Sequence, residues 1–146
     1  SRLFQRLREQ LGLVYTVSTF LSSHQGCGMF CLYSAQQAES EAQAMEAIEQ
    51  EVSALREKGV TDEELSRAKE LLKTGLVMGF ESSASRMSFN AREFIRRGFV
   101  RSVDELLQAV DRVDHASIGR VVQETFAPGR RCLSVVGRLS PKGYPQ

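Results

Sequence analysis

The chain has 146 residues, of which 42% are hydrophobic and 25% are charged, and its formal net charge is +1. This composition fits one soluble globular domain with a buried core and argues against a disordered chain. The near-neutral charge gives no reason to expect nucleic acid, an acidic partner or a membrane surface as the ligand. No apolar run approaches the roughly 18 residues of a membrane span, and we recognise no secretory signal.

The first predicted element is a short amphipathic helix that ends at a glycine. Its apolar side chains fall on one face of a 3.6-residue period, at Leu3, Phe4, Leu7 and Leu11. Gly12 can adopt the left-handed conformation that ends a helix, and an alternating strand pattern follows it. Arg8 is therefore expected in the last helical turn, with Tyr15 at the start of the strand just past the corner.

Residues 13–21 and 26–35 are predicted to form a β-hairpin joined by the loop 22–25. Both strands carry apolar residues on both faces, so we expect central strands that helices cover at least partly. The chain has three cysteines, Cys27, Cys31 and Cys132. An odd number does not make a disulfide framework, so reduced and buried thiols are expected.

Helical periodicity then dominates the chain up to residue 126. The predicted helices cover residues 38–58, 62–80, 86–97, 102–112 and 114–126. Capping boxes at Thr61 and Ser102 mark the start of two of them, and Asp114 is a candidate cap for the last. The predicted core stripes are Met45, Ile48, Val52 and Leu55; Leu65, Ala68, Leu72 and Leu76; Met87, Ala91, Phe94 and Ile95; and Ile118, Val121 and Val122.

A last strand is predicted at residues 131–136, after the turn Pro128–Gly129. The order of helix, two strands, five helices and one strand indicates an α+β fold, a two-layer α/β arrangement, and we expect residues 1–146 to form a single domain. Three strands alone would leave exposed sheet edges, so further strands are expected upstream of Ser1.

The sequence predicts no local zinc site. Neither His24 nor His115 has a second histidine at the spacing of a zinc-binding helix. His24, Cys27 and Cys31 offer three ligand types, but an extended strand would spread them over more than about 20 Å. No nucleophile elbow and no phosphate-binding loop is present.

Arg8 and Tyr15 are the remaining candidates for a functional site. A cation and a phenol at a rigid corner would suit a polar, anionic or carbonyl-rich ligand. A structural role stays open as well, because an arginine in the last helical turn compensates the helix dipole and a tyrosine simply suits a strand.

Three segments resemble the pitrilysin-type zinc peptidases, which include insulin-degrading enzyme and the mitochondrial processing peptidase. The segments are residues 1–15, 59–69 and 134–137, and the likeness runs through nearly the whole chain in order. In this family the N-terminal half carries the zinc motif H-x-x-E-H. The C-terminal half lacks that motif, but its arginine and tyrosine reach the substrate. This chain lacks the motif and keeps Arg8 and Tyr15 at the family's spacing, so it resembles the C-terminal half.

The resemblance implies a mixed, mainly antiparallel sheet covered by several helices. It implies the substrate-binding, catalysis-assisting domain of a zinc-dependent endopeptidase or oligopeptidase, with a peptide as substrate. Tyr15 would stabilise the negative charge that grows on the substrate carbonyl oxygen, and Arg8 would hold substrate carbonyls in register. The zinc and the general base would come from an N-terminal half, in the same chain or in a partner subunit. This chain alone is expected to hold no metal or other cofactor and to be inactive.

A non-catalytic structural or assembly subunit of the same superfamily is the alternative function, because some relatives hydrolyse nothing. A homodimer through an exposed sheet edge also stays open. We expect no nucleic acid and no membrane partner. The expected location is the bacterial cytoplasm, with the mitochondrial matrix as the alternative, and either compartment keeps cysteines reduced.

Overall fold

The structure is a computed structural model that describes residues 1–24 and 26–137. The chain divides into two compact units. The first contains residues 1–58 together with the chain from Val122 onward, and the second contains residues 59–121. Each unit is described by itself.

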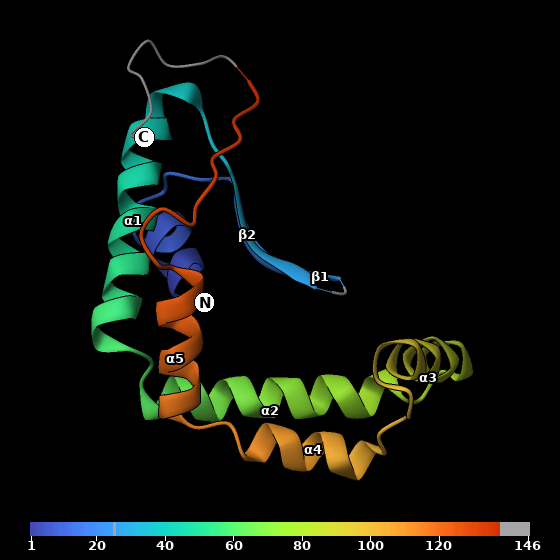
Figure 1. The fold of residues 1–146 in the computed structure, drawn as a ribbon. Coiled ribbons are helices and arrows are strands. Elements are labelled where there is room, and N and C mark those ends of the chain that lie inside the picture. The colour runs from blue at the N-terminus through green and yellow to red at the C-terminus, as the bar shows by residue number, and fades with distance from the viewer. Residues whose placement is uncertain (25, 138–146) are drawn as a thin grey trace. The chain divides into compact units, whose positions relative to one another are not determined.

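The first unit, which contains the N-terminus in Figure 1, opens with the helix η1 (Phe4–Gln10), and the predicted glycine, Gly12, follows its C-cap Leu11. Gly12 has a φ of 61°, the left-handed conformation that the sequence predicted. The helix is π-helical rather than α-helical, and the N–H of Leu11 donates to the carbonyl oxygen of Arg6 at 3.1 Å. This wider turn removes Leu11 from the predicted apolar face, so Leu11 is exposed while Leu7 is fully buried.

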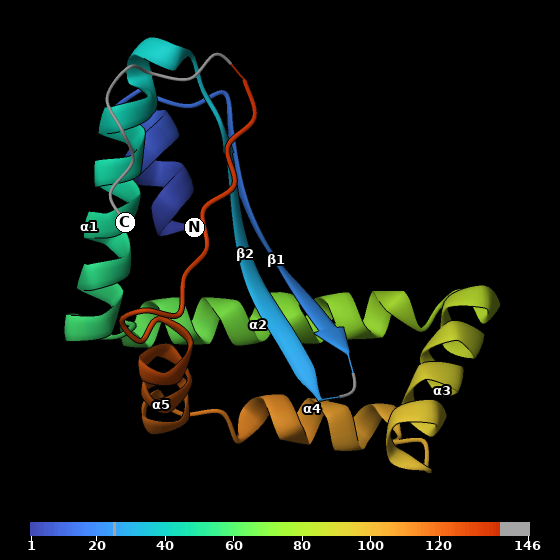
Figure 2. The same cartoon turned by 45° about the horizontal axis from the view of Figure 1, so that its top comes forward.

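A β-hairpin follows, formed by β1 (Thr16–His24) and β2 (Cys27–Ala35) (Figure 2). The strands are antiparallel, and their pairing runs from Thr16↔Ala35 to His24↔Cys27. The prediction of a loop over 22–25 was wrong for residues 22–24, which belong to β1. The expectation that helices cover both strands fails near the turn, where Phe20, Leu21 and Met29 are exposed.

The core of the first unit lies where η1 and the start of the hairpin meet α1 (Glu41–Lys58). A short 3₁₀ helix, η2 (Ala38–Ser40), leads into α1. The buried cluster consists of Leu7, Val14, Ala44, Ala47 and Ile48, with Met45 and Val52 of the predicted stripe packed against it. Both sides of the corner at Gly12 are therefore held by the same core.

The predicted strand at residues 131–136 is not a strand in the structure. The segment contributes no hydrogen-bonded ladder to the described sheet, which consists of β1 and β2 alone. Arg131 at its start pairs with Glu49, and before the segment Phe126 packs edge-on against Phe30 with ring centres 5.3 Å apart. An apolar run adopts strand structure only when a neighbouring strand satisfies its backbone groups.

The second unit is helical and contains α2 (Asp62–Gly79), α3 (Ser83–Arg97), α4 (Val103–Asp111) and the start of α5 (His115–Thr125). Complete capping boxes at Thr61 and Ser102 confirm the two predicted helix starts. Asp114 also caps α5, because its Oδ1 accepts the N–H of Ser117 at 2.8 Å. Helices α2 and α4 lie side by side (Figures 1 and 2).

The predicted core stripe of α3 was wrong. Met87, Phe94 and Ile95 are 67%, 61% and 82% exposed, and Ala91 is exposed too. The helix instead packs through Phe89, whose ring meets Phe80 edge-on at 4.9 Å. Three residues predicted to lie inward in other helices are likewise exposed, namely Ala68, Leu72 and Val121.

The structure confirms the predicted α+β fold class. The prediction of buried cysteines was wrong for Cys27 and Cys132, which are exposed, whereas Cys31 is half-buried; all are free thiols. Within the described residues, no helix combines the length and apolar character needed to cross a membrane.

Candidate functional site

Tyr15 lies between η1 and β1, directly after the corner formed by Gly12. Its backbone N–H donates to the carbonyl oxygen of Ala35 at 2.8 Å, which fixes the residue to the far end of β2. The preceding residue, Val14, is buried in the core. The side chain of Tyr15 points the other way and is 64% exposed. The core thus holds the backbone of Tyr15 while its phenol faces solvent.

Among the described residues, the hydroxyl of Tyr15 is hydrogen-bonded to Gln37. The side-chain amide of Gln37 donates an N–H to Tyr15 Oη at 2.6 Å. A phenol oxygen can accept such a bond and still donate its own proton to a second partner. Tyr15 therefore retains a hydrogen-bond donor for a ligand.

A shallow pocket adjoins this pair of side chains. Its volume is about 180 Å³, and it is lined by Gly12, Leu13, Val14, Tyr15, Gln37 and Ser40. These residues come from the corner after η1 and from the connection between β2 and α1. The pocket offers a hydroxyl, an amide and backbone groups, which suits a polar peptide backbone.

Arg8 lies in η1 and is exposed, as predicted for a residue in the last turn. Its guanidinium carbon is 5.2 Å from the centre of the Phe4 ring, a cation–π contact. Arg8 does not line the pocket beside Tyr15. The structure therefore places the two predicted site residues on one corner without joining them in one pocket.

Sequence reasoning missed Gln37. It lies in a polar stretch between a strand and a helix, where glutamine is unremarkable, and its partner Tyr15 is far away in the chain. The usable signal was the hairpin register. Pairing of Thr16 with Ala35 brings the residues just outside the hairpin, on either side, next to each other.

The described residues do not form a zinc site. Within residues 1–24 and 26–137, no group of three or more His, Cys, Asp and Glu side chains is placed to hold a metal ion. An extended strand does not separate His24 from Cys27, contrary to the prediction, because the two residues pair across the hairpin. Cys31 pairs with Phe20, farther along the strands, so the three candidates do not converge.

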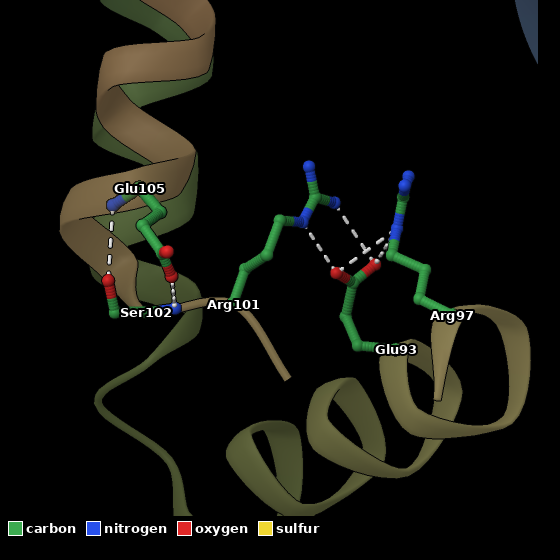
Figure 3. A network of polar contacts seen from close by, with 5 residues as sticks. All are labelled: Glu93, Arg97, Arg101, Ser102 and Glu105. Carbon is green, nitrogen blue, oxygen red and sulfur yellow. Dashed lines mark hydrogen bonds and ion pairs between the residues drawn. The ribbon is translucent and has the colours of Figure 1, made fainter. Parts of the chain in front are cut away.

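An ion-pair network of the second unit holds α3 to the start of α4 (Figure 3). Arg101 donates from Nε to Glu93 Oε2 at 2.6 Å and from Nη2 to Oε1 at 3.1 Å. Arg97 reaches the same carboxylate at 3.4 Å. The hydrogen bond from Arg101 lowers the pKa of Glu93, against the opposing effect of burial, and the carboxylate raises the pKa of Arg101. The network is a structural clamp, because every charge in it is paired.

Comparison with known proteins identifies the family. The family described as the Peptidase M16 inactive domain matches residues 1–72. The uncharacterized zinc protease YmxG of Bacillus subtilis is 32% identical over 126 residues, which cover 86% of this chain and 31% of that protein. An uncharacterized zinc protease of Mycobacterium tuberculosis is 34% identical over 134 residues, covering 92% of this chain and 29% of its own length.

Solved structures show the same fold. A conserved protein from Enterococcus faecalis superposes with a TM-score of 0.73 at 18% identity, covering 84% of this chain and 28% of its own. The periplasmic protease PqqL from Escherichia coli superposes with a TM-score of 0.64, also at 18% identity, covering 86% of this chain and 14% of its own.

These matches agree with the resemblance seen in the sequence. The chain belongs to the pitrilysin-type zinc protease family, the M16 peptidases, and it is part of the C-terminal, inactive domain. It spans about 31% of the length of YmxG. Zinc thus belongs to the family, although the described part of this chain supplies no ligand set for it.

Proposed function

We propose that this chain is the substrate-binding, catalysis-assisting part of a zinc-dependent endopeptidase or oligopeptidase. A peptide is the substrate, and the zinc and the general base come from an N-terminal half, in the same polypeptide or in a partner subunit. Membership of the inactive domain supports this division of labour, as do relatives that are named zinc proteases. We propose the bacterial cytoplasm as the location, in keeping with free cysteines and bacterial relatives.

The observation that carries this proposal is the exposed hydroxyl of Tyr15. The backbone of Tyr15 is held by the core and by Ala35, while the residue lines the pocket and its exposed phenol keeps a proton to donate. Attack on a peptide carbonyl places negative charge on the carbonyl oxygen, and a fixed hydroxyl stabilises that charge without reorganising. Removal of one such donor typically costs about 2.7–4 kcal/mol of transition-state stabilisation.

Arg8 has a separate role in the proposal. Its guanidinium carries five N–H donors in a planar fork, and the Phe4 ring supports it from one side. Peptide carbonyls are suitable acceptors, so Arg8 would hold the substrate backbone rather than the reacting carbonyl. Its place outside the pocket of Tyr15 fits this separation.

The test is reconstitution with the zinc-binding half. We would first read the coding region around this chain and its neighbouring genes for an H-x-x-E-H motif, then express that half alone and with this chain. We expect cleavage of a peptide mixture only when both parts are present, and no stoichiometric zinc in this chain by elemental analysis.

Cleavage by the zinc half at an unchanged rate without this chain would contradict assistance to catalysis. The absence of an H-x-x-E-H motif from both the coding region and the neighbouring genes would also contradict assistance to catalysis. Either result would favour the structural or assembly subunit instead.

A further inference from the structure

We infer that Gln37 is a positioning residue that sets the direction in which the Tyr15 hydroxyl donates its proton. The inference rests on the proposed function of Tyr15 and assigns a role to a residue outside the arginine–tyrosine segment. Its basis is the 2.6 Å hydrogen bond from Gln37 Nε2 to Tyr15 Oη at the edge of the pocket.

The backbone of Gln37 is fixed independently of this bond. Gln37 is the N-cap of η2, with φ −71° and ψ 152°, and its carbonyl oxygen accepts the N–H of Ser40 at 3.1 Å. Its side chain makes no capping bond to the helix that it begins. The amide is therefore directed to Tyr15 and takes no part in capping the helix.

The direction of the hydrogen bond between Gln37 and Tyr15 determines whether the phenolic proton stays available for a substrate. Because the amide N–H donates, it occupies a lone pair of the phenol oxygen and leaves the phenolic proton unused. An acceptor in the same place would take that proton and leave nothing to offer a substrate carbonyl. Gln37 thus orients Tyr15 as a donor toward the pocket, where a developing oxyanion would lie.

The backbone of Tyr15 needs no help from Gln37. Val14 is buried on one side of it, and Ala35 accepts its N–H on the other. What remains free in Tyr15 is the rotation of its side chain and of its hydroxyl, and these are the two motions that the Gln37 bond restricts. Replacement of Gln37 should therefore leave folding and substrate binding nearly unchanged.

The contact itself is testable in the 146-residue chain. The side-chain amide resonances of Gln37 in a ¹H–¹⁵N spectrum should move in the Tyr15→Phe variant, which lacks the acceptor oxygen. The amide resonances of Gln43, an exposed glutamine on α1, should stay in place. Unmoved Gln37 resonances would overturn the inference.

The role is testable in the peptidase reconstituted with its zinc-binding half. Three variants are compared after their free energies of unfolding are shown to be equal. Gln37→Leu removes the donor and should lower kcat about threefold to tenfold with little change in KM. Gln37→Glu offers only an acceptor, captures the phenolic proton and should lower kcat further. Gln43→Leu is the matched control and should retain the unaltered rate.

A double-mutant comparison separates this inference from the proposed function. In a Tyr15→Phe background, Gln37→Leu should cost nothing more, because Gln37 acts through the hydroxyl that is already gone. Loss of rate in Tyr15→Phe with full activity in Gln37→Leu and Gln37→Glu would overturn the role of Gln37 alone. Full activity in Tyr15→Phe would overturn the proposed function of Tyr15, and with it this inference.

Discussion

At the scale of single residues, Arg8 and Tyr15 make different kinds of contact. The phenol of Tyr15 is hydrogen-bonded by Gln37 beside a pocket, whereas the guanidinium of Arg8 rests on the Phe4 ring. In the proposed function, the Tyr15 hydroxyl donates to the reacting carbonyl oxygen and so acts on the transition state. The Arg8 guanidinium holds other carbonyls of the substrate backbone and so acts on substrate binding. The two residues should therefore affect different kinetic constants.

Arg8→Lys tests the binding role, because lysine keeps the charge and loses the planar fork. In the reconstituted peptidase we expect KM to rise about threefold to tenfold with kcat nearly unchanged, the pattern of lost uniform binding. The control is Arg6→Lys in the same helix, whose guanidinium is hydrogen-bonded to Gln10. A fall in kcat at constant KM would contradict the role given to Arg8.

Glu93 makes the stability of the second unit depend on pH. Its pKa is lowered from an ordinary value of 4.5 by the hydrogen bond from Arg101, so the folded state favours the carboxylate. The resulting stability is fully present above pH 4.5 and is lost as pH falls through the lower pKa of the folded state.

Glu93→Gln should lower the free energy of unfolding at pH 7 by about 1.5–3 kcal/mol, and the difference from the unaltered chain should shrink in acid. Urea unfolding at a series of pH values measures this. The matched control is Glu81→Gln, an exposed carboxylate just before α3 that should behave like the unaltered chain. A constant deficit from pH 7 to pH 3 would count against the ion pair.

Part of this site could be predicted from the sequence, and part of it could not. Gly12 marked the corner, so the positions of Arg8 and Tyr15 on it could be predicted. Gln37 could not, because the predicted four-residue loop gave the hairpin the wrong register. That register would set Tyr15 opposite Leu32, whereas the observed pairing of Thr16 with Ala35 continues to Tyr15 opposite Gln36, the residue next to Gln37.

At the scale of elements, the corner between η1 and β1 depends on the left-handed conformation of Gly12. A Cβ added to Gly12 would meet no atom within 4 Å, so a substitution there would be penalised by the backbone conformation alone. Gly75 in α2 has equally open surroundings but ordinary helical geometry. The same substitution at these positions should therefore have opposite effects.

Gly12→Ala should lower the free energy of unfolding by about 1–2 kcal/mol, the cost of a left-handed residue with a side chain. Gly75→Ala should raise it by about 0.5–1 kcal/mol, because alanine restricts the unfolded chain and favours the helix. Urea unfolding of both variants provides the comparison. Equal effects of the same sign would show that Gly12 is not held in the left-handed conformation.

Helix boundaries were more predictable than helix orientation. The caps at Thr61 and Ser102 depend on neighbouring residues, so local sequence determined them. Periodicity in α3 places Met87, Phe94 and Ile95 on one face of the helix. The local sequence does not indicate whether another element packs against that face, and in the structure all three side chains are exposed. Phe89 and Glu93 made the contacts instead, through Phe80 and Arg101.

At the scale of the whole molecule, the chain spans about a third of the zinc proteases it resembles, between 29% and 31% for the relatives named above. The fold class follows from the order of helices and strands. No described strand pairs with residues 131–136, so the apolar pattern of this segment alone was misleading. The proposed activity is therefore tested with the proposed zinc-binding half present.

The central claim is that Tyr15 stabilises the transition state of peptide hydrolysis. Its most direct test is the kinetics of Tyr15→Phe in the reconstituted peptidase, with Tyr33→Phe as the control, because Tyr33 is a similarly exposed tyrosine on β2 (53% against 64%). We predict that kcat falls about 100-fold or more in Tyr15→Phe while KM changes little, and that Tyr33→Phe retains the unaltered rate. An unchanged kcat in Tyr15→Phe would contradict the account.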